Sequence, residues 1–143
     1  MIENGAERLR DDIAAIEVAM LTTVEEDNNL RSRPMYTLQM DTQGTLWFFT
    51  SKNSPKLDEI EENNHVNLSY ADANSHTYIS ITGSAVCLDD PELKEKFWNP
   101  LHETWFPKGK EDTDLCLLKV RIKHVEIWDT ETSTMLELIR VEA

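Results

Sequence analysis

The chain has 143 residues, and its 14 lysines and arginines against 27 aspartates and glutamates give a net charge of −13. This length suffices for one domain with a core, and 40% hydrophobic residues with only four glycines exclude a disordered or repetitive protein. The acidic charge disfavours nucleic acid and anionic membranes as partners, and no run approaches the roughly 20 apolar residues of a membrane span. We therefore treat residues 1–143 as a single domain.

The first residues and the cysteines predict a cytoplasmic protein. Residues 1–7 contain two glutamates where a secretory signal has basic residues. Cys87 and Cys116 are too few for a disulfide framework and lack C-x-x-C spacing, so we expect two packed strand thiols. The four histidines share no ligand spacing, and no metal site is expected.

Hydrophobic periodicity predicts the elements along the chain. They are a helix at 6–16, strands at 20–24, 30–40 and 45–50, a short helix starting at Pro55, strands at 66–70 and 78–88, a helix starting at Pro91, and a strand at 115–128. Pro34 interrupts the alternating strand 30–40 and favours an edge or a bulge, and Gly83 favours a bend or bulge. The tail, 129–143, fits either a short helix or a strand.

Antiparallel strands with few helices indicate a mainly β fold. Six strands are predicted, and helices are confined to the N-terminus and two connections. This arrangement is typical of a small β-barrel or a strongly bent sheet, with its core at about residues 6–128.

Positive charge is concentrated between residues 31 and 56, where four bases and one acid give +3. At the end of this window, Thr50–Lys56 joins a strand to a helix, so its hydroxyls, lysines and free N–H groups suit a phosphate monoester. Ordinary capping by Ser54 would explain the same residues without a ligand. A hairpin would place Arg31–Arg33 beside Thr50, which favours the phosphate site. Lys56, in the first helical turn, is expected to be exposed.

Five motifs in this order resemble the general stress protein 26 group of the pyridoxamine 5′-phosphate oxidase-like, FMN-binding split-barrel superfamily. They are Met20–Thr23, Arg31–Met35, Leu46–Ser51, Ser54–Lys56 and the pair Trp98–Pro100 with Trp105–Pro107. The resemblance covers about residues 6–128. It implies a six-stranded antiparallel split barrel with an N-terminal helix and two short connecting helices, and a homodimer with FMN at the subunit interface.

The resemblance also implies a role for individual residues. Arg33 corresponds to a strand arginine near the phosphate, and Pro34 and Met35 lie along the flavin ring edge. Contacts to the ribityl chain and phosphate are implied for Phe49, Thr50, Ser51, Ser54 and Lys56. Tyr78 stands where the oxidases have a flavin-contacting glutamine. Trp105 and Phe106 would close over the ring from the partner chain.

Two departures from the oxidases bear on function. Ser54-Pro55-Lys56 replaces Ser-Arg-Lys and removes one cation, and residues 132–143 contain Arg140 but no Arg-x-His pair. Vitamin B6 oxidation is therefore not expected. The resemblance favours an FMN-dependent oxidoreductase with a small redox partner such as a nicotinamide. The alternatives are a non-catalytic module that stores or senses FMN and a structural barrel with a vestigial site. No catalytic acid or base is identified.

Overall fold

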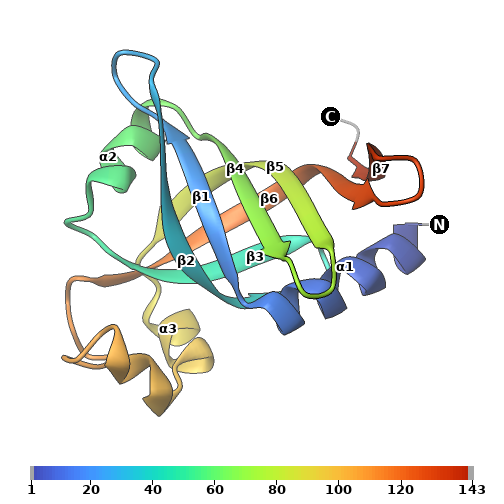
Figure 1. Ribbon diagram of the computed structural model, residues 1–143. Helices are drawn as coiled ribbons and strands as arrows, with labels where there is room; N and C mark the ends of the chain where they lie inside the picture. Colours follow the sequence, from blue (N-terminus) through green and yellow to red (C-terminus); the bar gives the residue numbers. More distant parts are fainter. Residues whose placement is uncertain (1, 142–143) are drawn as a thin grey trace.

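A computed structural model describes residues 2–141, in which antiparallel strands close into a barrel flanked by helices (Figure 1). In chain order the elements are α1 (Ile2–Ile16), β1 (Val18–Val24), β2 (Leu30–Met40), β3 (Thr45–Ser51), α2 (Pro55–Glu62), β4 (His65–Asp72), β5 (Thr77–Leu88), α3 (Pro91–Phe97), the 3₁₀ helix η1 (Pro100–Thr104), β6 (Leu115–Asp129) and β7 (Thr134–Arg140). Among residues 2–141, no helix has both the length and the apolar character needed to cross a membrane.

The strands form one sheet in the order β3-β2-β1-β4-β5-β6-β7. Because β3 also pairs with β6, the first six strands close on themselves, which confirms the six-stranded barrel. The tail left open by the sequence is a strand, since β7 pairs with the second half of β6 and extends the sheet beyond the barrel.

The barrel is open between the first half of β2 and the end of β3. The two strands pair only from Thr37 to Met40, and a bulge interrupts the register between Thr37 and Gln39. The earlier residues of β2 pair with β1 alone, which confirms the edge position predicted for Pro34. The bulge turns Met40 to the same buried side as Thr37, which strict alternation along the strand would place on opposite sides. The expectation that the hairpin places Arg31–Arg33 beside Thr50 was wrong, because the opening keeps these residues from pairing with β3.

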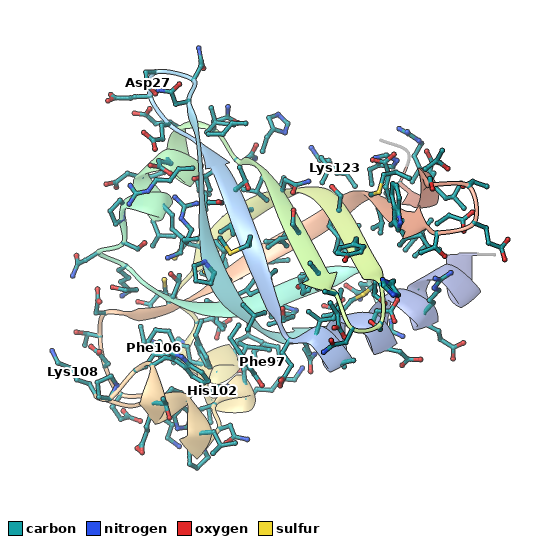
Figure 2. The ribbon with its side chains drawn as sticks, viewed as in Figure 1. Asp27, Phe97, His102, Phe106, Lys108 and Lys123 are labelled. Atoms are coloured by element: carbon teal, nitrogen blue, oxygen red, sulfur yellow. The ribbon has the colours of Figure 1, made fainter. Side chains whose placement is uncertain are left out.

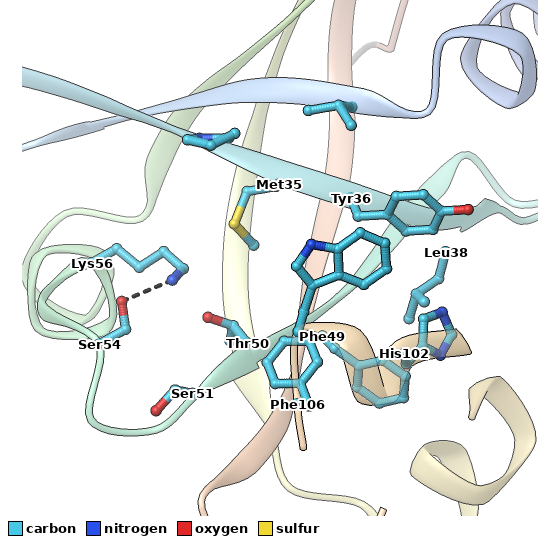
Figure 3. Close-up of a pocket in the computed structure, with 13 residues that line it drawn as sticks. Met35, Tyr36, Leu38, Phe49, Thr50, Ser51, Ser54, Lys56, His102 and Phe106 are labelled. Atoms are coloured by element: carbon cyan, nitrogen blue, oxygen red, sulfur yellow. Dashed lines mark hydrogen bonds between the residues drawn. The ribbon is translucent and has the colours of Figure 1, made fainter. Parts of the chain in front are cut away.

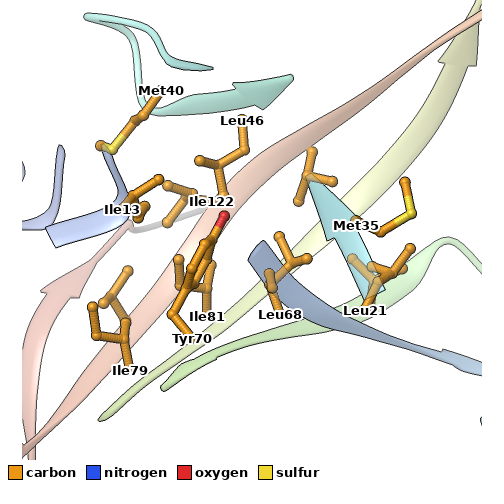
Figure 4. Packing of buried hydrophobic residues seen from close by; sticks show 14 of the residues in the cluster. Ile13, Leu21, Met35, Met40, Leu46, Leu68, Tyr70, Ile79, Ile81 and Ile122 are labelled. Atoms are coloured by element: carbon orange, nitrogen blue, oxygen red, sulfur yellow. The ribbon is translucent and has the colours of Figure 1, made fainter. Parts of the chain in front are cut away.

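The main core fills the barrel interior (Figure 4). Leu21, Leu46, Phe48 and Leu68 are fully buried there, and α1 covers one end with Leu9 and Ile13. The predicted bulge at Gly83 is confirmed, because the β5–β6 register shifts between Thr82 and Gly83. An added Cβ at Gly83 would lie 2.4 Å from the Arg121 carbonyl oxygen, so only glycine fits this approach.

A second apolar cluster lies outside the barrel, on the other side of β3 and β6. It contains Trp47, Phe49, Leu115 and Leu117, and the segment of α3 and η1 covers it. Asp90 caps α3 by accepting hydrogen bonds from two backbone N–H groups, and Pro91 occupies the first turn. Figure 2 shows Phe97, His102 and Phe106 gathered on this segment. The cluster therefore brings aromatic side chains to the edge of the barrel opening.

Candidate functional site

A cavity of about 400 Å³ occupies the opening between β2 and β3 (Figure 3). Its size falls in the range of small-molecule sites. Most residues singled out in the sequence line it: Pro34, Met35, Phe49, Thr50, Ser51, Ser54, Lys56, Trp105 and Phe106. Hydroxyls and Lys56 form one end of the cavity, and aromatic rings form the other.

Thr50, near the end of β3, provides an unsatisfied polar atom. Its side chain is 3% exposed, and its hydroxyl is the one buried side-chain polar atom without a hydrogen-bond partner among the described residues. Leaving a buried hydroxyl unpaired costs about 1–3 kcal/mol, and such groups are uncommon in folded proteins. A ligand that hydrogen-bonds to Thr50 would remove this cost.

Lys56 is buried, not exposed as the sequence suggested. Only 8% of the residue is accessible, because its side chain turns from the first turn of α2 toward the cavity (Figure 3). Its ammonium donates to the Ser54 hydroxyl at 2.8 Å and makes no salt bridge to a carboxylate among residues 2–141. Burial, and secondarily the positive charge of Arg33, lower the pKa of Lys56. An anionic group would stabilise the charged form at this position.

The two serines at this end of the cavity, Ser51 and Ser54, differ in their hydrogen-bond partners. Ser54 occupies the N-cap position of α2, but its side chain makes no capping hydrogen bond and instead accepts a hydrogen bond from the Lys56 ammonium. The Ser51 hydroxyl donates to Asp114, a carboxylate that also accepts from the Asn53 N–H. Helix capping therefore does not explain the position of the Ser54 side chain, whose hydroxyl is hydrogen-bonded to the ammonium of Lys56.

Arg33 lies beside the cavity but does not line it. Its guanidinium donates to the Thr23 hydroxyl at 2.7 Å and to the Glu59 carboxylate at 3.1 Å. The hydrogen bond from Thr23, and then Arg33, hold the pKa of Glu59 below its usual range. Arg33 thus joins β1, β2 and α2 in a polar cluster, and its direct contact with a phosphate stays a prediction.

The aromatic end is built within one chain. Trp105 stacks on Tyr36 of β2 with ring centroids 5.3 Å apart, and Phe106 meets Phe49 edge-on at 6.1 Å. Both residues line the cavity of their own chain, and the expectation that they close over the ring of a partner chain's flavin stays a prediction. The chain after η1 folds back onto β2, which places both rings in the cavity of their own chain.

His102 is a cavity residue that the sequence reasoning missed. Its Nδ1 accepts a hydrogen bond from the Asn99 backbone N–H at 3.0 Å, so the proton of the neutral ring is on Nε2. Burial lowers the pKa of His102, which favours this neutral form. The signal was present in the sequence, because Asn99-Pro100 followed by His102 is a capping pattern that orients the imidazole.

Tyr78 is not brought to the cavity. It lies at the start of β5, opposite Ala71 of β4, and is 37% exposed on the outer surface of the sheet. It therefore does not line the cavity formed by the described residues of its own chain, and its role stays a prediction.

The site combines a buried ammonium that has no carboxylate partner and a buried hydroxyl that has no hydrogen-bond partner with an aromatic wall, which suits a ligand with an anionic group and a planar ring. Together with the closed six-stranded barrel, these features define the class. The chain belongs to the pyridoxamine 5′-phosphate oxidase-like family, whose pattern matches residues 4–143.

Within this family, the chain is a homologue of general stress protein 26. It is 31% identical to General stress protein 26 of Bacillus subtilis over 97 residues, covering 66% of this chain and 69% of that protein. The crystal structure of a general stress FMN/FAD binding protein from Xanthomonas citri is 28% identical, with a TM-score of 0.76 and 99% of both chains covered. A general stress protein 26-related structure from Clostridium acetobutylicum, 19% identical, shares the fold with a TM-score of 0.81 and 96% of both chains covered.

Proposed function

We propose that this protein binds FMN in the cavity between β2 and β3. The main support is that Lys56 and Thr50 line the same end of one cavity. The Lys56 ammonium is buried without a carboxylate partner, and the Thr50 hydroxyl is buried without a hydrogen-bond partner among the described residues. A phosphate and the ribityl hydroxyls near it would satisfy both groups. The similar Xanthomonas citri protein is described as FMN/FAD binding, which supports a flavin as the ligand.

Different residues of the cavity bind different parts of the flavin. Lys56 and the Ser54 hydroxyl bind the phosphate, and Thr50 donates to or accepts from the ribityl chain. Phe49, Phe106 and Trp105 exclude water from the ring. Bound FMN supplies hydride- and electron-transfer chemistry, for which the protein provides orientation and an apolar surrounding.

We further propose a homodimer that closes the cavity. The outward residues of β1, β4, the start of β5 and the first half of β2 include no Asp, Glu, Lys or Arg, although 29% of the chain is charged. They are Val18, Met20, Thr22, Val24, Leu30, Ser32, Pro34, Tyr36, His65, Asn67, Ser69, Ala71, Tyr78, Ser80 and Thr82, and the strand register makes them one continuous face. An uncharged face of this extent is typical of an interface.

This face adjoins the cavity. Val18, Pro34 and Tyr36 belong both to the face and to the cavity lining, so a second copy seated there would cover the flavin. Tyr78 lies on the same face, where the second chain could bring it to the site. Light scattering should show a dimer, and Met20→Glu should give monomers. Leu136→Glu, an equally drastic change on exposed β7, should leave the dimer intact. A monomeric parent protein with FMN bound would contradict the proposal.

The reaction we propose is electron transfer between FMN and a small partner such as a nicotinamide. Vitamin B6 oxidation is not proposed, because Arg140 pairs with Glu137 on β7 and does not line the cavity. A second candidate is a flavin-storing or flavin-sensing module without turnover. It is favoured by the cavity lining: among residues 2–141, the titratable side chains that line it are Tyr36, Lys56 and His102, and none of the lining side chains is a carboxylate.

Two measurements test binding and turnover separately. An absorbance spectrum of the purified protein, followed by titration with FMN, should show flavin bands and saturable binding. Steady-state reduction of bound FMN by NADH or NADPH should then exceed that of free FMN. Binding without such reduction would favour the storage module, and absence of binding to FMN or FAD would leave the structural barrel.

A further inference from the structure

The two cysteines of the chain meet inside the barrel. Cys87 lies near the end of β5 and Cys116 near the start of β6, and their sulfur atoms are 2.8 Å apart. In the antiparallel register, Cys87 is opposite Leu118, so Cys116 lies two residues further along the same face of β6. Both side chains are free thiols.

The two thiols differ in accessibility. Cys116 is fully buried, whereas Cys87 is partly exposed. Burial is the main cause that raises the pKa of Cys116, and the neighbouring Cys87 adds to it. A reagent from solvent therefore reaches Cys87 first, and Cys116 is already in place behind it.

The thiol pair also lies next to the polar end of the cavity. Cys116 is directly opposite Thr50 in the pairing of β6 with β3. Two side chains opposite each other in an antiparallel pair point to the same face of the sheet. The sulfur pair and the unpaired hydroxyl of Thr50 are consequently neighbours, although the thiols are outside the cavity lining.

We propose that Cys87 and Cys116 are a redox-active dithiol that a hydroperoxide converts into an intramolecular disulfide. The Cys87 sulfur, as thiolate, attacks the terminal peroxide oxygen, the O–O bond breaks, and an alcohol or water leaves, which forms a sulfenic acid. The Cys116 sulfur then attacks the Cys87 sulfur, the S–O bond breaks, and water leaves with the remaining proton. Two thiols are oxidised by two electrons, and one hydroperoxide is reduced.

The pairing explains why the second step would be fast. A sulfenic acid at Cys87 forms within contact distance of a thiol that no other reagent can easily reach. The disulfide would join the neighbouring strands β5 and β6 without bringing distant segments together. The proposal does not depend on FMN binding, because neither sulfur lines the cavity.

The experiment follows both thiols in the whole protein exposed to hydrogen peroxide, with dimedone present to trap sulfenic acid. The wild type should lose both thiols together, yield a cross-linked peptide containing Cys87 and Cys116 that is lighter by two hydrogens, and recover both thiols with dithiothreitol. Dimedone labelling should be low.

Two variants separate the roles of the cysteines. In Cys116→Ala, Cys87 should be labelled by dimedone, because no resolving thiol remains. In Cys87→Ser, the Cys116 thiol should be oxidised at least about tenfold more slowly than in the wild type, because burial protects it. Far-ultraviolet circular dichroism checks that each variant is folded, and Cys116→Ser replaces Cys116→Ala if the latter unfolds.

Three results would overturn the proposal. The first is a wild type in which Cys87 accumulates as the dimedone adduct or a sulfinic acid while Cys116 stays reduced. The second is a disulfide that links two chains instead of two strands. The third is equal loss of the Cys116 thiol with and without Cys87.

Discussion

Two cationic side chains, Arg33 and Lys56, flank the open end of the barrel, and they differ in their hydrogen-bond partners. The Arg33 guanidinium is held by the Thr23 hydroxyl and the Glu59 carboxylate, whereas the Lys56 ammonium has a single neutral acceptor, Ser54. Arg33 therefore stabilises the junction of β1, β2 and α2. Lys56 is buried without a counter-charge, an arrangement that is costly unless a ligand supplies the charge. A basic residue near a phosphate site is informative only once its own partners are known.

The largest expected effect is on FMN affinity in Lys56→Ala. Removing a charge-assisted contact worth roughly 1.5–3 kcal/mol should weaken FMN about tenfold to a hundredfold or somewhat more. Riboflavin, which lacks the phosphate, should lose little affinity. Titration of both flavins into both proteins gives four dissociation constants and one coupling energy. Lys52→Ala removes the same charge from a residue paired with Asp89 and should bind FMN like the parent. Equal effects on the two flavins would remove Lys56 from the phosphate site.

Arg33→Ala should act on folding more than on the flavin. The substitution leaves Glu59 and Thr23 without their shared donor, so the free energy of unfolding should fall by about 1–3 kcal/mol. Urea denaturation of the apo protein measures this change. A double-mutant cycle with Glu59→Gln should show coupling between the two residues. If Arg33→Ala reduced the affinity for FMN more than Lys56→Ala did, Arg33 and not Lys56 would be the main phosphate-binding residue.

Thr50→Val tests the unpaired hydroxyl with a side chain of similar shape. FMN binding should weaken by about 1 kcal/mol, which is roughly fivefold, because one neutral hydrogen bond is lost. The apo protein should be as stable as the parent or more stable, since the variant removes a buried polar atom that has no partner. Thr50→Ser keeps the hydroxyl and serves as the control. A destabilised apo Thr50→Val protein would mean that the hydroxyl is satisfied within the chain.

The smallest effect concerns His102 at the aromatic end. Its pKa is lowered in the folded protein, so below the ordinary value of about 6.5 the unfolded chain binds a proton that the folded one resists. Stability should therefore fall as the pH drops through 6.5 toward the folded pKa. His102→Gln lacks this contribution. The difference in the free energy of unfolding between the parent protein and His102→Gln, measured by urea denaturation, should therefore be smaller at pH 5 than at pH 7.5. Parallel curves would show that His102 titrates freely.

Much of the fold could be predicted because strands and turns are local patterns. The helices that start at Pro55 and Pro91 and the bulge at Gly83 follow from proline and glycine stereochemistry. The tail remained open because its apolar residues fit two periods, and pairing with β6 decides between them.

The site was less predictable than the fold. Alternation along β2 could not reveal the bulge that opens the barrel. The burial of Lys56 depends on where α2 packs, and the availability of Arg33 depends on Glu59, which is 26 residues away in the sequence. His102 was missed because it was considered as a metal ligand, whereas its position is set by a capping pattern.

The bulge at Gly83 also decides which side chains of β5 and β6 can react with each other. Before the bulge, Ile81 pairs with Val125; continuing that register would pair Cys87 with Lys119 and turn Cys116 to the opposite face of the sheet. The observed shift of one residue pairs Cys87 with Leu118 instead and turns both sulfurs inward. Gly83 therefore sets the phase of the two strands, and a backbone position with no side chain governs whether the two thiols meet.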